Sequence, residues 1–399
     1  MSRVLGYMRF LSFGIPLKAF TRDIRLLCLS NAIGAFGEGL YFWVFPLYIR
    51  QLQADYTQLG LVFSVLYAVS ALAPLPGGIL ADRFDRKKIL ILAWTPWVLS
   101  PLLYSVAQNW TQLIPGAACW GLSMIGVPAF NAYIITSIED KTNLASILSV
   151  VWSSYSFSYI FAPTVGAYLS TIVGMQWVLR LSGLFCAVAT GVFLFLTSQH
   201  PRKAETVRTG YRMPSDAERR LWRQVHVWAA FFTAFTFFAT IGRTFVPTFL
   251  AEEAKMNEFY VGLFGSINFA GITFIGITMG RLGDRRRKSS IISICLLFYA
   301  LSMVPLFLTG EPAVLMPAAF FYGGSIVVGS LVSSFVGTIA PENKRGLWVS
   351  VPQTMSLIAA FAAPYLGGIL YTWSPLGTFA FSILPMPLLA FFAVMGLKE

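Results

Sequence analysis

A single carboxylate interrupts a long apolar run near the start of the chain. Glu38 stands in Gly34-Ala-Phe-Gly37-Glu38-Gly39, about fourteen residues into a run that is long enough to cross a bilayer. An ionisable side chain at this depth is costly to bury, and burial favours its neutral, protonated form. A carboxyl group that takes up and releases a proton is the chemistry that this placement supports. We therefore expect Glu38 to carry a coupling proton.

No other group of residues assembles a reactive site. The two histidines, His200 and His226, stand apart from any set of acids and nucleophiles, and the four cysteines lie singly inside apolar runs. The sequence contains no Cys-x-x-Cys pair and no Gly-x-x-x-x-Gly-Lys-Ser/Thr phosphate-binding element. We therefore expect no enzyme activity, no metal and no cofactor. A proton gradient is the expected source of energy.

The composition requires a membrane around these residues. Of the 399 residues, 56% are hydrophobic and 12% are charged, and the mean hydropathy is +0.69. A soluble domain carries about 25% charged residues, so this chain has too few to cover a globular surface. A soluble enzyme, a nucleic-acid-binding protein and a disordered scaffold are thereby nearly excluded.

Twelve apolar runs reach the length of roughly 20 residues that a helix needs to cross a bilayer core. The runs are continuous rather than alternating, which excludes the strands of a β-barrel. An all-α membrane protein is therefore the expected class. The predicted spans are 24–50, 58–81, 88–107, 112–137, 144–171, 175–197, 225–250, 259–282, 289–308, 313–339, 346–372 and 375–396.

The basic residues indicate how the spans are oriented. With the N-terminus in the cytoplasm, 25 of the 29 Lys and Arg residues fall on the cytoplasmic side, and only Arg50 and Lys255 on the other. Seven of the 25 lie in 198–224, which separates six spans from six. We expect a six-helix bundle at 1–197, a basic cytoplasmic linker at 198–224 that anchors to anionic lipid, and a second bundle at 225–399. Both termini are expected in the cytoplasm, in a bacterial plasma (inner) membrane.

The two halves repeat each other at a nearly constant offset. Residues of the same type recur 202 or 201 positions apart, which is unlikely by chance and indicates parallel six-helix repeats related by pseudo-symmetry. Transporters are commonly built in this way, with a site between the halves. The matching pairs are Gly60 and Gly262, Gly78 and Gly280, Asp82 and Asp284, Pro46 and Pro247, and Pro163 and Pro364.

Two loops carry a motif at matching places in the halves. The segments are Gly78-Ile-Leu-Ala-Asp82-Arg83-Phe-Asp85-Arg86-Lys87-Lys88 and Gly280-Arg281-Leu-Gly-Asp284-Arg285-Arg286-Arg287-Lys288. Both resemble the loop 2–3 motif of the major facilitator superfamily, although Asp85 and Arg286 stand where that motif usually has Gly. With the helix count, linker and repeat, the resemblance covers the whole chain. It implies the fold of that superfamily, with twelve helices in two six-helix bundles.

The motif residues suit a gate at the cytoplasmic face. Glycine lets two helices approach closely, and an Asp such as Asp82 can face the positive N-terminal end of a helix of the other half. Arg83 and Arg86 can pair with Glu139 or Asp140. We expect these residues, with the second copy at Gly280, Asp284 and Arg285, to hold the cytoplasmic side closed. Simple topology anchoring is the alternative for the basic residues.

A second resemblance lies in helices 5 and 11. Ala162-Pro163-Thr-Val-Gly166 and Ala363-Pro364-Tyr-Leu-Gly367-Gly368 are similar to the Gly-Pro-x-x-Gly-Gly element of drug–proton antiporters in this superfamily, with Ala in place of the Gly before each Pro. Proline bends a helix and glycine permits tight packing. The similarity favours export over import.

Arg243 lies well inside helix 7, the repeat partner of helix 1, at the position that matches Phe42. In the superfamily, helices 1, 4, 7 and 10 line the central cavity. The resemblance therefore implies that Glu38 and Arg243 lie on opposite walls of one cavity, where Arg243 either binds an anionic group or modulates Glu38. Polar and aromatic residues that we expect to line the cavity are Asn31, Tyr41, Tyr67, Asn131, Trp152, Tyr155, Asn268 and Gln353.

These features together predict a secondary transporter that exports amphipathic or lipophilic small molecules in exchange for protons by alternating access. One alternative is a proton-coupled or facilitative importer of a small organic or anionic solute, which Arg243 would favour, and another is a translocase of lipids or lipid-linked sugars. The expected partners are a small-molecule substrate, protons and membrane lipid, without nucleic acid. The superfamily's usual monomer is the expected state.

Overall fold

The computed structural model describes residues 20–138, 144–200, 216–341 and 345–397, and every regular element within these ranges is a helix. The helices of the first half, which we call the N half, are α2 (Arg22–Phe42), α3 (Phe45–Gln51), α4 (Tyr56–Leu72), α5 (Pro74–Arg83), α6 (Arg86–Ser105), η2 (Trp110–Gln112), α7 (Leu113–Ser123), α8 (Gly126–Ser137), α9 (Leu144–Val173), α10 (Met175–Val192) and η4 (Phe193–Phe195). Those of the C half are α11 (Asp216–Arg243), α12 (Val246–Glu252), α13 (Glu258–Arg285), α14 (Lys288–Met303), α15 (Pro305–Leu308), α16 (Pro312–Tyr322), α17 (Gly324–Ile339), α18 (Arg345–Trp373), α19 (Pro375–Ile383) and α20 (Pro385–Gly396).

These helices join end to end into twelve rods, six in each half, which confirms the predicted fold. Among the described residues, ten rods are long and apolar enough to cross a membrane, and the pair α2 and α3, bent by 43°, makes an eleventh. The remaining rod is α6, which carries Pro96 and Pro101 in its interior and three basic residues in its first turn. The chain is therefore a multi-pass membrane protein.

Several breaks in the rods lie at prolines or glycines. Pro46 stands in the first turn of α3, and Pro247, its repeat partner, in the first turn of α12. Proline lacks an N–H and fits the first turn of a helix, so each starts a new segment and interrupts the span before it. The rods α7–α8 and α16–α17 are also interrupted near their middles, next to Gly126 and Gly323. The first, fourth, seventh and tenth spans are thus all discontinuous.

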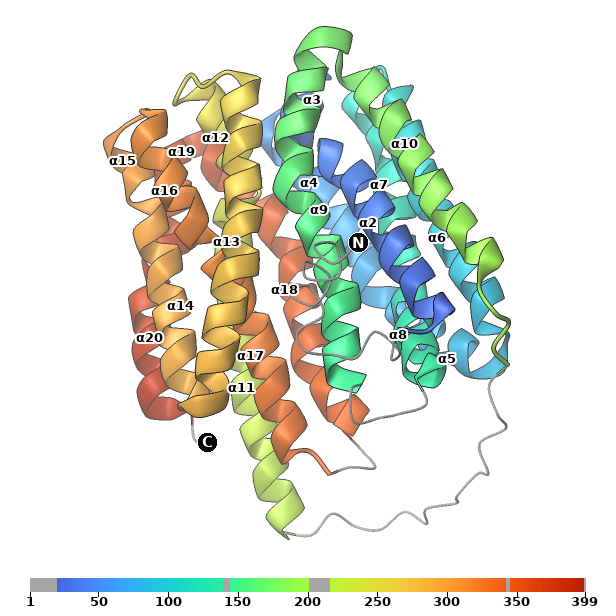
Figure 1. Cartoon of the computed structure of the whole chain (residues 1–399). Coiled ribbons are helices and arrows are strands. Elements are labelled where there is room, and N and C mark those ends of the chain that lie inside the picture. Colours follow the sequence, from blue (N-terminus) through green and yellow to red (C-terminus); the bar gives the residue numbers. More distant parts are fainter. Residues whose placement is uncertain (1–19, 139–143, 201–215, 342–344, 398–399) are drawn as a thin grey trace, which may run out of the picture.

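The two halves pack side by side through two pairs of rods (Figure 1). Helix α4 contacts α18, and α9 contacts α13, so each half gives one rod to each contact. One end of the molecule, which we call the linker end, is where α10 finishes and α11 begins; the C-terminal end of α20 lies there too. The opposite end, which we call the far end, carries the turns that lead from α3 into α4 and from α12 into α13.

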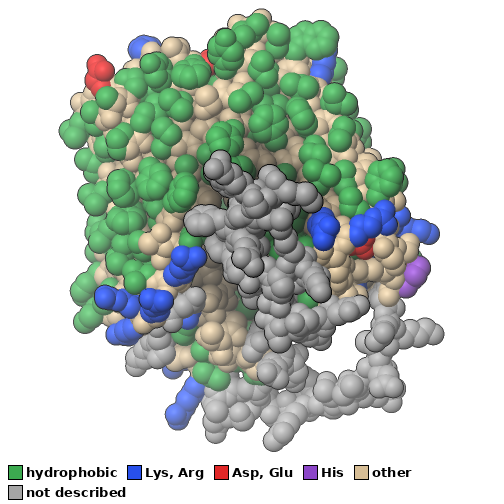
Figure 2. Space-filling view, viewed as in Figure 1, with side chains coloured by type: hydrophobic (Ala, Val, Ile, Leu, Met, Phe, Trp, Pro, Cys, Tyr) green, Lys and Arg blue, Asp and Glu red, His purple; other side chains and the backbone are tan. Residues whose placement is uncertain are grey.

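Side-chain types divide along the same axis. Figure 2 shows hydrophobic side chains over the middle and upper part of this face, and Lys and Arg side chains gathered toward the linker end. The apolar band includes large exposed side chains such as Leu308, Leu384 and Trp373, which a bilayer would cover. Helix α11 begins at Asp216 rather than at 225, so it takes up part of the predicted linker, and residues 201–215 lie outside the described ranges.

Candidate functional site

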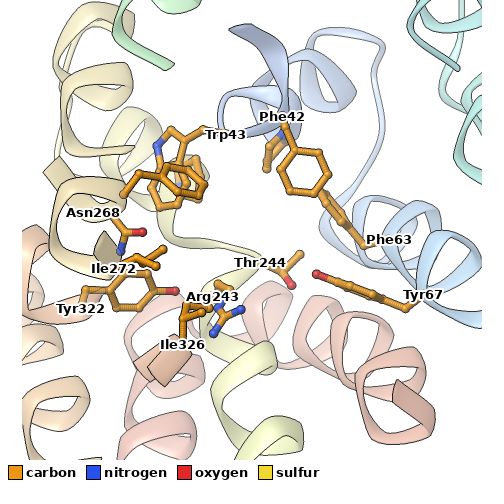
Figure 3. Close-up of a pocket in the computed structure, with 13 residues that line it drawn as sticks. Phe42, Trp43, Phe63, Tyr67, Arg243, Thr244, Asn268, Ile272, Tyr322 and Ile326 are labelled. Atoms are coloured by element: carbon orange, nitrogen blue, oxygen red, sulfur yellow. The ribbon is translucent and has the colours of Figure 1, made fainter. Parts of the chain in front are cut away.

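A cavity of about 210 Å³ lies between the halves, which we call the central cavity. Residues at or beside the breaks of three interrupted spans line it, namely Trp43, Thr244 and Tyr322. Figure 3 shows the side chains that surround it, with the hydroxyls of Tyr67 and Tyr322 pointing from opposite sides toward the space around Arg243. The lining residues are Phe42, Trp43, Pro46, Phe63, Tyr67, Arg243, Thr244, Pro247, Asn268, Phe269, Ile272, Tyr322 and Ile326.

Matching positions of the two sequence repeats line the central cavity. Phe42 and Arg243 are repeat partners, and both line it, as do the partners Pro46 and Pro247. Matching positions of the two halves lie close together only near the pseudo-twofold axis, so this cavity lies at that axis. The two walls differ in chemistry, because the N half contributes aromatic rings at the place where the C half contributes a cation.

Glu38 lines a second cavity of about 220 Å³, inside the N half, which we call the N-half cavity. The side chain is 2% exposed, and both carboxyl oxygens accept hydrogen bonds. Trp120 Nε1 donates to Oε1 at 2.7 Å, and Tyr155 Oη donates to Oε2 at 2.9 Å. Tyr159 lies 3.4 Å from Tyr155, oxygen to oxygen, and extends the set of hydroxyls. These two donors fix the position of the carboxyl group in an otherwise apolar bundle.

The two cavities are separated by a pair of stacked rings. Phe42 faces the central cavity, Trp120 faces the N-half cavity, and their centroids lie 5.5 Å apart at 23°. The expectation that Glu38 and Arg243 share one cavity is therefore wrong for this conformation. Glu38 and Phe42 lie one turn apart on the same side of α2, and Trp120 of α7 contacts both and fills the space between the carboxylate and the interface.

The other predicted cavity residues divide among three places. Tyr67 and Asn268 line the central cavity, and Asn31, Trp152 and Tyr155 line the N-half cavity. Three more lie outside both. Tyr41 packs between Phe45 and Tyr104, Asn131 accepts a hydrogen bond from Trp152 Nε1 at 3.3 Å, and Gln353 donates to Ser333 Oγ at 3.3 Å.

Among the described side chains of the motif loops, none forms an ion pair with the other half. A Cβ at Gly78 or Gly280 would meet nothing within 4 Å, and Asp82 is exposed. The expected close approach at these glycines is therefore not present in this conformation. Arg83 and Arg285 are exposed as well, whereas Arg86 bonds within its own half to Thr136 Oγ1 and the carbonyl of Ala132. Glu139, Asp140 and the side chain of Asp284 lie outside the described part of the chain.

The proline–glycine elements, in contrast, lie at tight helix crossings toward the far end. A Cβ on Gly60 would stand 2.2 Å from the carbonyl oxygen of Pro364, and one on Gly262 would stand 2.6 Å from that of Pro163. Since these four residues form two repeat pairs, the same contact is made twice, once on each side of the pseudo-twofold axis.

Gly166 and Gly367 continue the elements within each half. Gly166 abuts the carbonyl of Leu40, and Gly367 lies against Ile241, which is the repeat partner of Leu40. Each Pro–Gly element thus packs its helix on the other half through its proline and on its own half through Gly166 or Gly367.

One ion pair between the two halves was not predicted from the sequence. Arg50 Nε donates to Glu252 Oε1 at 2.8 Å, and Tyr56 Oη donates to Glu252 Oε2 at 2.7 Å. Ser170 Oγ also bonds across the halves, to Glu258 Oε2 at 2.7 Å. The repeat carried a signal for this pair, because Arg50 and Glu252 are 202 positions apart, which is one of its two offsets.

Asp85 also has a role that the motif comparison missed. Ser198 Oγ donates to its Oδ2 at 2.7 Å, and the backbone N–H groups of Gln199 and Lys87 donate to its Oδ1 at 3.1 and 3.0 Å. Burial alone would raise the pKa of Asp85, but these hydrogen bonds outweigh it and hold the pKa below the ordinary value. Standing where the motif usually has Gly, Asp85 fastens the residues that follow α10 to the loop before α6.

Two six-helix bundles related by a sequence repeat, with a cavity on their shared axis, have the architecture of a membrane carrier. The chain belongs to the Major Facilitator Superfamily, whose model matches residues 27–246 and 239–399. It is similar to multidrug resistance protein 2 of Bacillus subtilis, at 23% identity over 88% of this chain and 89% of the relative. Multidrug resistance protein MdtG of Salmonella arizonae is 26% identical over 78% of each chain.

Other comparisons widen the range of functions in the family. A Na(+), Li(+), K(+)/H(+) antiporter of Planococcus maritimus is 24% identical over 88% of this chain and 90% of that protein. Among solved structures, the nucleoside transporter NupG superposes with a TM-score of 0.80 at 15% identity, covering 94% of this chain and all of that one. These findings make the chain a transporter of small molecules and not an enzyme.

Proposed function

We propose that the protein exports amphipathic or lipophilic small molecules in exchange for protons. The observation that carries the proposal is the isolation of Glu38, a single buried carboxyl group in a chamber of the N half that adjoins the central cavity without being part of it. A proton site and a substrate site separated by one pair of rings can influence each other without competing for the same space. The names of the multidrug resistance relatives support export.

The stacked rings of Phe42 and Trp120, which separate the central cavity from the N-half cavity, would couple substrate binding to the protonation of Glu38. Trp120 bonds to Glu38 through its indole N–H and stacks on Phe42 through its ring, so a ligand that packs on Phe42 holds the indole against the carboxyl group. A donor held on a buried carboxyl group favours its charged form, so substrate binding would release the proton, as exchange requires. Tyr155 and Tyr159 are the other hydroxyl groups beside it, and Tyr41 and Cys186 lie within electrostatic reach. In this scheme, substrate occupancy and the protonation of Glu38 are coupled through Trp120.

The orientation follows from the same proposal. The linker end, with its basic side chains, faces the cytoplasm of a bacterial cell, and the far end faces outward. The contacts at the far end close the path to the outside, so the described conformation would receive its substrate from the cytoplasm. A cation antiporter, suggested by one relative's name, is not favoured, because the residues that line the central cavity include Arg243 and no Asp or Glu.

The test is flux in proteoliposomes under an imposed pH gradient, for the wild type and for Glu38→Gln. A panel of lipophilic cations, anions and neutral amphiphiles supplies the substrates. We expect gradient-driven flux to disappear in Glu38→Gln while exchange of substrate without a gradient persists. Glu311→Gln, at an exposed acid of the far end, is the matched control. Gradient-driven flux that survives in Glu38→Gln would remove the carrier role of Glu38, and flux indifferent to the gradient would make the protein a facilitator or lipid translocase.

The role of Trp120 in coupling is tested separately with Trp120→Phe, which keeps an aromatic ring against Phe42 and removes the hydrogen-bond donor to Glu38. In detergent, adding substrate to the wild type should change the pH of a weakly buffered solution, and Glu38→Gln should abolish that change. Trp120→Phe should bind substrate within about threefold of the wild type and exchange several-fold fewer protons. If Trp120→Phe exchanged as many protons on substrate binding as the wild type, Trp120 would not couple substrate binding to Glu38.

A further inference from the structure

The guanidinium of Arg243 is a cation without a described counterion. Its Nε is buried and has no hydrogen-bond partner, and one terminal nitrogen reaches Ser325 Oγ at 3.5 Å, the limit of a hydrogen bond. Arg243 forms no ion pair among the described residues, and no carboxylate lines the central cavity beside it. A buried charge left without a partner is strongly destabilising, so this position demands an explanation.

Two further donors meet at the same place without partners. Asn268 Nδ2 on α13 and Tyr322 Oη on α16 are buried, at 3% and 2% residue exposure, and neither has a hydrogen-bond partner. Both line the central cavity with Arg243, so three elements of the C half direct polar groups into one space. Native proteins leave few buried polar groups unpaired, and a cluster of three in a cavity is a site prepared for a ligand.

The chemistry of these groups selects the ligand. Arginine N–H groups and the amide of Asn268 donate, and the Tyr322 hydroxyl can donate as well. Their common complement is a group with two or three acceptor oxygens and a negative charge, such as a carboxylate, sulfonate or phosphate ester, which a guanidinium binds through parallel hydrogen bonds. An organic ammonium or an alkali cation would meet a like charge there.

The opposite wall selects the rest of the molecule. The N half contributes Phe42, Trp43 and Phe63, and Phe269 of α13 stands with them. Trp43 is fixed by a hydrogen bond from its Nε1 to the carbonyl of Val261 at 2.9 Å, so its ring is a rigid surface. Rings of this kind supply apolar contact area to a flat or lipophilic body. The cavity volume of about 210 Å³ limits that body to a small one in this conformation.

We infer that the transported substrates are small amphiphilic organic anions, whose acidic group binds Arg243, Asn268 and Tyr322 while an aromatic or lipophilic body rests on Trp43 and Phe42. This inference rests on the proposed function, since it names the substrate class of the proposed exporter. It divides the amphipathic molecules considered above by charge, with anions bound and lipophilic cations excluded. Because the anion holds the C half and the body holds the N half, the ligand spans the interface that must rearrange during transport.

The experiment compares three probes that differ in charge and share a body: 2-naphthoate, its methyl ester and 2-naphthylmethylammonium. Binding is measured at equilibrium to purified protein in neutral detergent, for the wild type, Arg243→Gln and Arg243→Lys. We expect the wild type to bind naphthoate at least tenfold more tightly than the ester, and the ammonium more weakly still. Arg243→Gln should lose at least tenfold in affinity for naphthoate and keep its affinity for the ester, which also shows that the variant is folded. Arg243→Lys should retain part of the preference.

Arg180→Gln is the matched control, because Arg180 is exposed on α10 and stacks on Trp177 outside the cavity. Equal binding of the three probes to the wild type, or an intact preference for naphthoate in Arg243→Gln, would overturn the inference. Displacement of naphthoate by phosphatidylglycerol, and not by soluble sulfonates, would keep the anionic head and assign it to a lipid. Binding is measured without a gradient, so a negative binding result would not affect the conclusion drawn from flux in Glu38→Gln. A negative result in that flux experiment would likewise not affect the anion site at Arg243.

Discussion

The two ends of the molecule use the same repeat in opposite ways. At the far end, the repeat pair Gly60 and Gly262 lies against the carbonyls of the repeat pair Pro364 and Pro163. At the linker end, the repeat pair Gly78 and Gly280 faces open space. Glycine occupies matching positions on both sides of the membrane, yet only one side has the close backbone approach that glycine permits.

The polar contacts divide in the same manner. The far end is bonded between the halves, by Arg50 with Glu252 and by Ser170 with Glu258. At the linker end, Asp85 holds Ser198 within the N half. The difference indicates a carrier that is closed at the far end and unlocked at the linker end. Alternating access requires the linker end to close in its turn, and the unused glycines are the positions where that closure would bring helices together.

The largest effect should come from filling a far-end contact. Gly60→Ala places a Cβ 2.2 Å from the Pro364 carbonyl oxygen, where neither backbone can yield easily. Overpacking of this kind costs about 1–3 kcal/mol, which would move the equilibrium toward an open far end by roughly 5- to 150-fold. Spin labels at Thr111 and Glu311, in a background without the four native cysteines, should show longer distances, and flux should fall at least tenfold.

Gly191→Ala is the control for that change, because a Cβ there meets nothing within 4 Å on a helix of the N half. It should leave distances and flux unchanged. A Gly60→Ala variant with wild-type label distances would mean that the α4–α18 crossing does not move during transport.

The next effect concerns the motif glycine. Gly78→Leu should fold normally, because its side chain enters open space in the conformation described here. It should block closure of the linker end, so labels at Phe84 and Arg286 should stay far apart under conditions that close this end in the wild type. Flux should fall about tenfold with thermal stability preserved. Normal flux in Gly78→Leu would show that helices do not come together at Gly78 when the linker end closes.

The sequence predicted the architecture because its signals are periodic and redundant. Twelve apolar runs, one basic linker and several residue pairs at one offset each point to two six-helix halves, and no single residue decides the matter. The repeat also placed Arg243 opposite Phe42, and both residues line the central cavity. It was not used to predict the ion pair between Arg50 and Glu252, which are 202 positions apart.

The candidate site was harder to predict, because the position of a residue along a helix does not reveal which side chains of other helices pack against it. Glu38 and Phe42 are one turn apart on α2 and face different cavities, since Trp120 from α7 fills the space between them. Tyr41, between them in sequence, packs into an aromatic cluster instead. Such choices depend on long-range packing, which one sequence does not reveal.

A smaller effect should follow from loosening the ion pair at the far end. Glu252→Gln weakens the bond with Arg50 and keeps an acceptor for Tyr56. With both side chains of the pair about 30% exposed, the change should be worth up to about 1 kcal/mol, or about a fivefold shift toward an open far end. The Thr111–Glu311 label distance should report it, and the shift should shrink as salt is raised. Its exposed neighbour offers the control Glu253→Gln, and an equal shift in both would make the effect one of net charge.

The smallest effect on transport should come from Asp85→Asn, which alters a bond within one half. Flux should stay within about twofold of the wild type, because no contact between the halves is lost. Stability should fall by roughly 1–2 kcal/mol at neutral pH, since the carboxylate accepts hydrogen bonds from Ser198, Gln199 and Lys87. The pKa of Asp85 is held below its ordinary value, so this stabilisation is present above about pH 4 and is lost as the pH falls through the folded-state pKa. Thermal unfolding of both proteins between pH 7 and pH 3 should show the difference narrowing only at the acid end. A large loss of flux in Asp85→Asn at full stability would instead make the linker attachment part of the gate.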